Sequence, residues 1–358
     1  MSPSWYDPSI WVLGGAVLDT NALLSERFRQ FARRECRGSS SLYEHLAERI
    51  ADDAELLRLA AHSSGGQPVP NLFLGAVHYL LLGGIRHPAA EYYPSLVDDP
   101  REPTEAFVEF KAFCERYAHE IIPILKNKLV QTNEVRRCAY LYPSFCHIYK
   151  VTGKPLALIE IGTSAGLQLL WDQYSYSYRT GRTYGARQSP LEIDADIRGA
   201  SFPFLFEQSP PVTSRIGLDL HINRIADPEN YLWLRALIWP EHQERVRCFE
   251  RAAACLSGQP LELIEGDGVA LLPSVASGAA KDATLCIFHT HVANQIPRES
   301  KLELEEQIRA LGLQRDVFHL YNNMWDGDLH LDYFLEGRQF KNTIAKTDGH
   351  GRWFEWLL

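Results

Sequence analysis

The sequence predicts an α/β protein with a mostly parallel sheet, an antiparallel C-terminal edge and an N-terminal all-α domain. Three patterns predict it. Apolar residues recur at three- and four-residue spacing from about residue 19 to 149, as on amphipathic helices. From residue 154, short apolar runs alternate with helical segments, as in βαβ units. From about residue 329, apolar residues alternate at period two, which indicates antiparallel strands.

These patterns predict a helical domain over residues 1–150 and an α/β domain over residues 151–358. In the first, the apolar run 72–85 is shorter than the roughly 18 to 20 residues of a membrane span, so we expect a buried helix and no membrane partner. In the second, residues 174–212 are interpreted as an inserted hairpin and loop. Its tyrosines alternate as on one strand face, and Thr180 with Gly181 suits a turn.

Composition narrows the classes of function. Proteins that hold a phosphate backbone rely on Lys and Arg, whereas this chain has a formal net charge of -9, so we expect no nucleic-acid partner. The seven cysteines include no CxxC pair, which argues against a zinc ribbon or redox dithiol and favours free thiols. The N-terminus lacks a basic segment followed by an apolar core, so we expect a cytoplasmic protein. Because a nucleic-acid partner is disfavoured, we expect a small-molecule substrate.

Residues 156–166, LALIEIGTSAG, predict a buried strand, a glycine-rich turn and the start of a helix. Ligands of open α/β sheets bind beyond the carboxyl ends of the strands. Gly162 permits close approach of a ligand to the backbone, and Gly166 lets the helix start tightly against the sheet. The amides near Thr163 and Ser164 offer donors to an anionic group. A carboxylate at Glu160 could receive an ammonium group.

Acidic residues follow the next two predicted strands. Asp219, followed by Leu220, ends the run VTSRIGLDL, and Asp267, followed by Gly268, ends the run LELIEGD. An acid after the second strand suits a ribose diol, and an acid after the third can accept from an adenine amine. With Glu160, these positions predict a ligand that contains adenosine and an amino-acid tail.

The motifs EIGTSAG, IGLDL and IEGDG resemble those of the class I S-adenosylmethionine-dependent methyltransferases. More narrowly, EIGTSAGLQLLWDQYSYSY, RIGLDL, WLRALIWPE, EGDG, IFHTH and the upstream QTNEVRR resemble a bacterial family catalogued as domain of unknown function 2332. This resemblance covers nearly the whole chain. It implies a Rossmann-like sheet that binds S-adenosylmethionine and transfers its methyl group to a small molecule.

Two features depart from the methyltransferase pattern. Asp219 lies 59 residues after Glu160, against roughly 20 in a simple dinucleotide-binding unit, so it is the ribose acid only if the tyrosine-rich piece is an insertion. Asp172 and Asp194 are weaker substitutes for it. The fourth strand carries IFHTHVANQIP in place of the Asn/Asp-Pro-Pro-aromatic signature of methylases that act on amino groups of nucleobases and glutamine.

His289, at the end of the fourth strand, is the leading candidate for catalysis and also lies among the cofactor-binding candidates, because imidazole titrates near neutral pH. His289 and His291 would project from one strand face, and a metal site with His319 or Asp267 is an alternative. Because spacing places no third ligand, we expect no metal. Polar residues before the α/β domain and in the insertion complete the substrate-side candidates: Gln131, Asn133, Glu134, Arg137, Tyr178 and His291.

Two further functions remain open. The letters of EIGTSAG also satisfy GxSxG, the nucleophile elbow of serine hydrolases, with Ser164 as nucleophile, Asp267 as acid and His289 or His350 as base. Such a hydrolase needs several strands before its elbow, and the first 150 residues predict helices instead. The other alternative is a non-catalytic protein that binds S-adenosylmethionine or S-adenosylhomocysteine.

Overall fold

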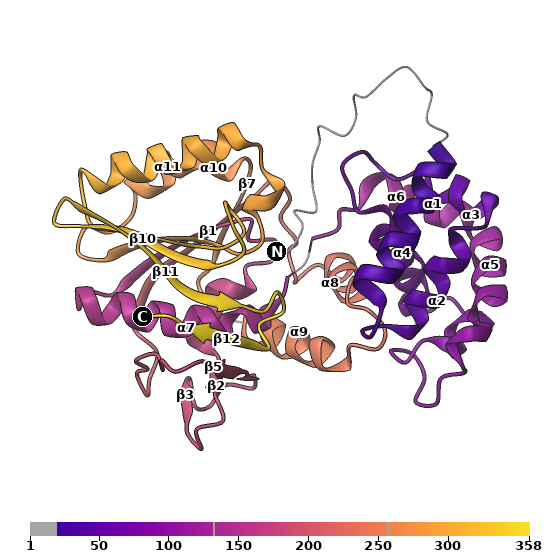
Figure 1. Ribbon diagram of the computed structural model, residues 1–358, viewed down its shortest axis with the longest axis horizontal. Helices are drawn as coiled ribbons and strands as arrows, with labels where there is room; N and C mark the ends of the chain where they lie inside the picture. The colour runs from indigo at the N-terminus through magenta and orange to yellow at the C-terminus, as the bar shows by residue number, and fades with distance from the viewer. Residues whose placement is uncertain (1–19, 132, 257) are drawn as a thin grey trace. The chain divides into compact units, whose positions relative to one another are not determined.

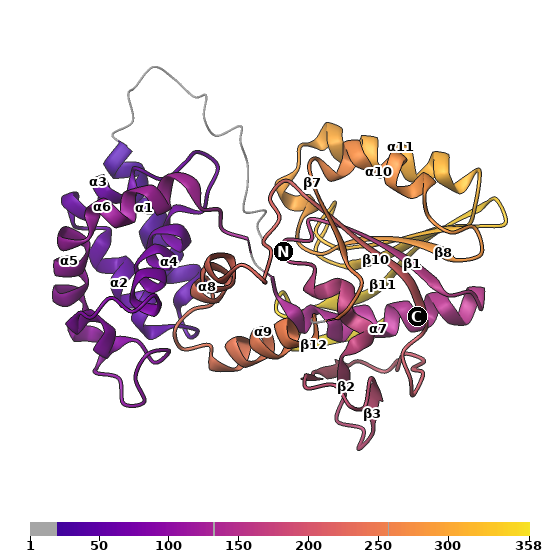
Figure 2. The same ribbon diagram turned by 180° about the vertical axis from the view of Figure 1, so that it is seen from behind.

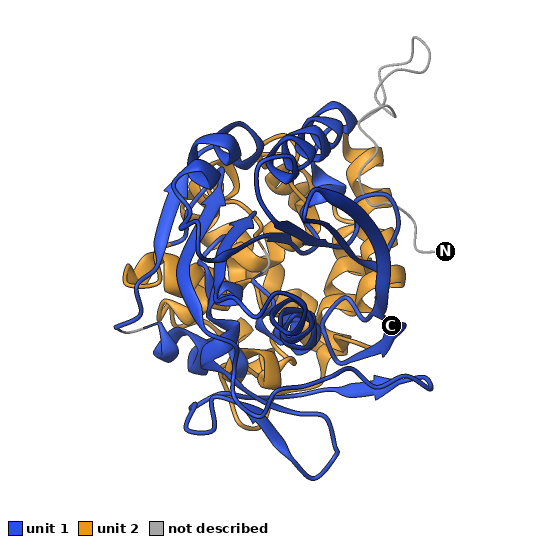
Figure 3. Cartoon of the chain, turned by 90° about the vertical axis from the view of Figure 1, so that its left-hand side faces the viewer, with its two compact units in different colours: residues 1–11, 133–223, 248–358 blue, residues 12–132, 224–247 orange. Residues whose placement is uncertain are grey.

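The computed structural model describes residues 20–131, 133–256 and 258–358. These residues divide into two compact units (Figure 3). The helical unit comprises residues 20–131 and 224–247, and the sheet unit comprises residues 133–223 and 248–358. The chain therefore enters the sheet unit before residue 150, and it returns to the helical unit for one segment of the C-terminal half.

The helical unit confirms the N-terminal helical region. Short polar side chains cap some of its helices; Asp53, for example, accepts from the backbone N–H groups of Glu55 and Leu56, both at 3.0 Å. Residues 69–82 form a helix that is buried on most sides, as expected of the apolar run. The α-helices of this unit are α1 (Thr20–Phe31), α2 (Ser41–Ile50), α3 (Ala54–Ala60), α4 (Val69–Leu82), α5 (Ala106–Arg116), α6 (Ala118–Asn127), α8 (Pro228–Ala236) and the first turn of α9 (Gln243–Cys255).

Long-range contacts explain why residues 224–247 belong to the helical unit. The indole N–H of Trp233 in α8 donates to the carbonyl of Leu129 at 2.8 Å, and the ring is buried in the helical core. The carboxylate of Glu241 accepts from the Leu42 N–H at 2.9 Å and from the Ser40 hydroxyl at 2.7 Å. Within the described ranges 20–131, 133–256 and 258–358, no helix is long and apolar enough to span a membrane.

The sheet unit contains a nine-stranded sheet in the order β5-β12-β11-β10-β9-β8-β1-β6-β7. β1 pairs in parallel with β6 and β8, whereas the hairpins β9–β10 and β10–β11 and the pair β11–β12 are antiparallel. The mostly parallel sheet and its antiparallel C-terminal edge are therefore confirmed. The strands are β1 (Leu156–Ile161), β5 (Asp196–Arg198), β6 (Val212–Asp219), β7 (Glu262–Glu265), β8 (Thr284–His289), β9 (Val317–Tyr321), β10 (Leu329–Leu335), β11 (Arg338–Thr347) and β12 (Trp353–Trp356).

Helices cover both faces of this sheet. α10 (Gly268–Ser277) and α11 (Arg298–Gly312) lie on one face, and α7 (Cys138–Thr152) lies on the other, as both Figure 1 and Figure 2 show. Ile159, Ile287 and Val317 join the apolar core under α10 and α11. On the opposite face, Phe145 of α7 packs edge-to-face against Phe288 of β8, with ring centroids 5.4 Å apart. The alternation of side chains along a strand explains this division.

The tyrosine-rich piece forms a small second sheet. β2 (Ser175–Ser177) and β3 (Thr183–Gly185) pair antiparallel around residues 178–182, which confirms the hairpin, and β4 (Glu192–Asp194) pairs with β2. β5 then adds in parallel to the edge of the large sheet through β12, a pairing that the sequence did not predict. The insertion therefore contributes strands to both sheets: β2, β3 and β4 form the small one, and β5 joins the large one.

The order of the parallel strands locates a candidate ligand site. From β1 the chain continues to β6 and β7 on one side, and then returns to β8 and β9 on the other side of β1. The direction of winding therefore changes between β1 and β8. In open sheets, ligands bind beyond the carboxyl ends of the strands at such a switch point.

Candidate functional site

The turn after β1 has the left-handed backbone that its glycines suggest. Gly162, Ser164 and Gly166 have φ angles of +74°, +52° and +76°. A β-carbon on Gly162 would lie 2.3 Å from Cγ2 of Val292, in the loop after β8. The close approach expected of a ligand at Gly162 is therefore made by a side chain of the protein itself.

The helix after this turn is the short 3₁₀ helix η6 (Leu167–Gln173) rather than an α-helix. Gly166 does let the turn pack tightly, because a β-carbon there would lie 2.8 Å from Cδ2 of Leu261. The backbone N–H of Ser164, however, donates to Oδ2 of Asp219 at 2.7 Å. The expectation that this amide binds an anionic ligand is therefore wrong, because a carboxylate of the chain already accepts its hydrogen bond.

Asp219 lies beside the first turn in spite of its distance in sequence, because β6 pairs with β1 through Leu218 and Ile161. Its Oδ1 also accepts from the His221 N–H at 3.1 Å. Burial raises the pKa of Asp219, and hydrogen bonds from these backbone groups offset part of the rise. The acid thus ties together the loops after β1 and β6.

The two substitutes for Asp219 have other partners. Asp172 forms a buried ion pair with Arg215 of β6, and neither side chain is more than 8% exposed. Asp194 pairs with Arg179 at 3.4 Å on the surface. Asp219 is therefore the acid that the structure places at the turn after β1.

The acid after β7 begins a helix. Asp267 accepts from the N–H groups of Val269 at 2.9 Å and Ala270 at 3.2 Å, and so caps α10. A β-carbon on Gly268 would lie 2.8 Å from Cγ2 of Ile161, so this glycine lets α10 approach β1. Leu220, the residue after Asp219, is 72% exposed.

Glu160 is a buried carboxyl group at the end of β1. It is 3% exposed, and the hydroxyl of Thr163 donates to its Oε2 at 2.5 Å. Burial raises its pKa to about 8, and the negative charge of Asp219 adds to the rise, while the Thr163 hydroxyl and the Arg137 guanidinium oppose it. At neutral pH most of this carboxyl group is protonated, and a cation placed beside it would favour the ionised form.

The polar segment that precedes α7 belongs to the same end of the sheet. The Arg137 guanidinium donates from Nε to the Gly349 carbonyl at 3.0 Å and from Nη1 to the Thr290 carbonyl at 3.4 Å. Gln168 donates to the Glu134 carbonyl at 3.2 Å and accepts from the Thr290 hydroxyl at 2.9 Å. The structure therefore brings Glu134 and Arg137, two of the substrate-side candidates, to the loops after β1 and β8.

A histidine that the methyltransferase interpretation left out completes this group. Nδ1 of His350 lies 3.1 Å from Oε2 of Glu134. The Glu134 side chain is 3% exposed, and the His350 side chain is 46% exposed. Sequence reasoning also missed Gln168 and Thr290, although a glutamine within the apolar run LQLLW was a visible signal.

Three other substrate-side candidates lie elsewhere or make other contacts. Gln131 belongs to the helical unit. The hydroxyl of Tyr178 donates to the Ala139 carbonyl at 2.8 Å, so its polar end is used in packing the insertion against α7. Asn133 begins the sheet unit, and its buried Nδ2 has no hydrogen-bond partner among the described residues.

His289 is enclosed. It is 1% exposed, its Nε2 lies 3.1 Å from Nε2 of His319, and its ring stacks on Tyr321. Burial lowers its pKa to about 3, with a smaller contribution from the Lys301 ammonium. An imidazole that holds a proton so weakly, and that no substrate can reach, does not suit a general base.

His291 does not share a strand face with His289, so that prediction is wrong. β8 ends at His289, and His291 has a φ of +56° in the loop beyond it. The His291 N–H donates to Oδ1 of Asn322 at 2.9 Å, and Nδ2 of Asn323 donates to its Nδ1 at 3.1 Å. The two asparagines at the end of β9 thus hold this imidazole against the loop after β8.

The alternatives to a cofactor site receive less support from these contacts. Nδ2 of Asn223 donates to the Ser164 hydroxyl at 3.2 Å, whereas His289 and His350, the bases nominated for a hydrolase, bond to His319 and Glu134. Among the residues that the structure describes, no group of three or more His, Cys, Asp or Glu side chains could hold a metal ion.

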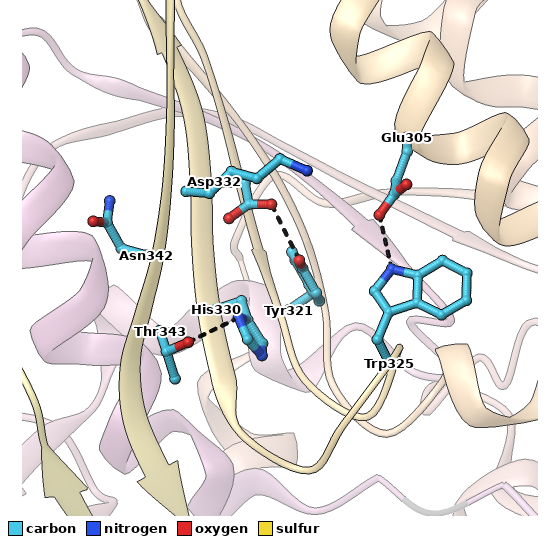
Figure 4. Close-up of a pocket in the computed structure, with 8 residues that line it drawn as sticks. Glu305, Tyr321, Trp325, His330, Asp332, Asn342 and Thr343 are labelled. Atoms are coloured by element: carbon cyan, nitrogen blue, oxygen red, sulfur yellow. Dashed lines mark hydrogen bonds between the residues drawn. The ribbon is translucent and has the colours of Figure 1, made fainter.

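A separate pocket of about 270 Å³ lies on the antiparallel part of the sheet (Figure 4). Trp325 donates to Glu305 at 2.8 Å on one side, and Tyr321 donates to Asp332 at 3.1 Å on the other. Residues of β9, β10 and β11 line this pocket, and β8 lies between β9 and β1 in the sheet. We therefore assign the pocket no part in the candidate site.

Fold and site together define a class: a mixed α/β protein whose polar side chains gather at the switch point of an open sheet. A family model described as an uncharacterized protein conserved in bacteria, DUF2332, matches residues 25–356. The chain belongs to this family. The comparisons found no match to this chain among the curated proteins or the solved structures.

Proposed function

We propose that the sheet unit binds S-adenosylmethionine at the carboxyl ends of β1 and β6 and acts as a methyltransferase on a small molecule. The observation that carries the proposal is the placement of Asp219 against the turn after β1, next to the buried carboxyl group of Glu160. The resemblance of EIGTSAG, IGLDL and IEGDG to the class I methyltransferases points to the same ligand. S-adenosylmethionine would supply an electrophilic methyl group on a sulfonium centre.

The residues at this end of the sheet fit the chemistry of such a ligand. Glu160 is a desolvated carboxyl group that a cation would ionise, which suits the ammonium group of the amino-acid tail. An ionised carboxylate has about four acceptor positions, so Asp219 can accept from a ribose diol while it holds two backbone N–H groups. The exposed side chain of Leu220 offers apolar surface to an adenine ring.

Two features limit how the ligand would lie. Val292 fills the space beside Gly162, so the ligand would pass the turn on another side or displace this side chain. Asp267 already caps α10 through one carboxylate oxygen, so the other oxygen would meet an adenine amine.

The seven free thiols agree with a reducing compartment such as the cytoplasm.

The experiment is a thermal-shift titration of the full chain with S-adenosylmethionine and S-adenosylhomocysteine. A ligand that binds only the folded state stabilises it by about 2.7 kcal/mol at 100 times its dissociation constant, so we expect a clear rise in Tm with either ligand. The matched pair is Asp219→Asn, which should weaken both shifts, and Asp194→Asn, which should leave them unchanged because Asp194 pairs with Arg179 on the surface.

The alternatives predict different results. No stabilisation by either ligand, together with labelling of Ser164 by a fluorophosphonate, would replace the proposal with a serine hydrolase. Binding without methyl transfer to any acceptor in a screen of hydroxyl, amine and thiol compounds would favour a non-catalytic binding protein.

A further inference from the structure

We infer that Glu134 and His350 form the general base of this site, and that the methyl acceptor is an O–H or N–H group that must lose its proton. The inference rests on the proposed methyltransferase function. It assigns to His350 the role that the sequence alone suggested for His289.

The geometry is that of a base and the group that orients it. Oε2 of Glu134 lies 3.1 Å from Nδ1 of His350, so Nδ1–H donates to the carboxylate and Nε2 keeps its lone pair. Glu134 is buried, whereas nearly half of the His350 side chain is exposed. A buried carboxylate that fixes the tautomer of a histidine is the arrangement by which serine proteases prepare their base.

Both partners are held in place by further hydrogen bonds from their neighbours. The Arg136 N–H donates to Oε1 of Glu134 at 3.4 Å, and Gln168 donates to the Glu134 carbonyl at 3.2 Å. Asp348 accepts from the His350 N–H at 3.2 Å and pairs with the guanidinium of Arg352 at 2.9 Å. The pair is thus fixed from both sides, although 216 residues separate its members.

The turn that carries His350 also packs closely on the segment that carries Glu134. Gly351 has a φ of +71°, and a β-carbon there would lie 2.4 Å from the carbonyl oxygen of Arg136. A surface ion pair that merely bridges two loops needs no such fit. The close packing keeps the imidazole within hydrogen-bond distance of the carboxylate.

The other titratable groups around His350 come from three places. Asp348 and Arg352 lie on its own turn and pair with each other. Arg137 lies next to Glu134 in the chain and donates to the Gly349 carbonyl of the same turn. His291, in the loop after β8, interacts electrostatically with His350 and is itself held neutral by burial. Glu134 is therefore the charge that bonds directly to the imidazole.

The proposed step balances as follows. The O–H or N–H proton of the acceptor passes to Nε2 of His350, and the electron pair of the acceptor forms a bond to the methyl carbon. The carbon–sulfur bond breaks with its electrons on sulfur, so the sulfonium becomes a neutral thioether. His350 then carries the positive charge beside the Glu134 carboxylate, and its exposed edge returns the proton to water.

The test begins with NMR of the histidine ring nitrogens in the full-length protein, with His350 assigned through His350→Asn. The Glu134 carboxylate should hold the His350 proton on Nδ1 in the wild type, and Glu134→Ala, which removes this acceptor, should move the proton to Nε2. The control is Asp326→Asn, whose partner His330 lies 2.7 Å away on β10. This change should alter the ring-nitrogen signals of His330 and leave those of His350 unchanged. The same tautomer of His350 in wild type and Glu134→Ala would overturn the inference.

The second readout separates this inference from the function on which it rests. With a methyl acceptor from the screen, His350→Asn should lower the transfer rate by about 10²- to 10⁴-fold and leave the Kd for S-adenosylmethionine within a few-fold. Full transfer activity in His350→Asn would refute the role of His350 as general base and leave the proposed methyltransferase function intact. Wild-type protein that binds no S-adenosylmethionine would refute the proposed function instead.

Discussion

The backbone N–H of Ser164 donates to Oδ2 of Asp219 at 2.7 Å and so joins the loops after two neighbouring parallel strands, β1 and β6. Asp219→Asn replaces one of the two accepting oxygens with an N–H₂ group, which cannot accept. We expect the free energy of unfolding to fall by about 1–2 kcal/mol, measured by urea denaturation. Asp194→Asn, in a surface ion pair, should change it by less than about 0.5 kcal/mol. Equal effects of the two changes would mean that this hydrogen bond does not stabilise the turn.

Gly162 and Gly153 form a matched pair of left-handed glycines, with φ angles of +74° and +64°. A β-carbon at Gly153 meets nothing within 4 Å, whereas at Gly162 it meets Val292 at 2.3 Å. Gly153→Ala should cost about 1–2 kcal/mol of stability, and Gly162→Ala roughly 1–3 kcal/mol more. Val292→Ala in the Gly162→Ala background should recover part of that excess. If the two glycine variants unfold at the same urea concentration, Val292 does not pack on Gly162.

The ion pair between Asp172 and Arg215 is buried, with exposed fractions of 8% and 6%. Asp172→Ala leaves the guanidinium buried without this carboxylate and should destabilise the protein by about 3–5 kcal/mol, as measured by chemical denaturation. The exposed pair Arg179–Asp194 is the control, and its loss should cost at most about 1 kcal/mol. A small effect of Asp172→Ala would show that water reaches Arg215.

Glu160 should give stability a distinct pH dependence. Its pKa is about 8 in the folded chain against 4.5 for the unperturbed group, so between these values the native state holds a proton that the unfolded state has lost. Stability from this group is therefore greatest at low pH and is lost as the pH rises through this window, by up to about 5 kcal/mol. Asp219 contributes with the same sign, because its pKa is also raised.

Glu160→Gln isolates the contribution of Glu160, since all other titrating groups remain. Denaturation curves from about pH 5 to about pH 8.5 should show a steeper loss of stability in wild type than in the variant. Parallel curves would mean that Glu160 is already ionised in the folded protein.

The sequence predicted β1, β6, β7, β8 and β9 of the large sheet because each is a short apolar run bounded by polar residues. LALIEIG, VTSRIGLDL and ATLCIFHTH correspond to β1, β6 and β8. The same logic placed Glu160 and Asp219 at carboxyl ends of neighbouring strands. What these strands share is a local pattern, which a single sequence displays.

Features that depend on contacts across the chain could not be predicted in this way. Val292 packs on Gly162, and Glu134 meets His350, only because the sheet brings separate loops together. The addition of β5 to β12 and the packing of Trp233 in the helical core have the same origin. The burial that makes His289 a poor base also arises from packing, since a histidine at a strand end reads the same in sequence whether enclosed or open.

The central claim, that Glu160 and Asp219 hold the amino-acid and ribose parts of S-adenosylmethionine, is tested most directly by calorimetry in buffers of different ionisation enthalpy. Binding of the cationic ligand at about pH 7 should release about one proton from the Glu160 carboxyl group of the wild type and none from Glu160→Gln. No heat of binding, or the same proton release in wild type and variant, would contradict the account.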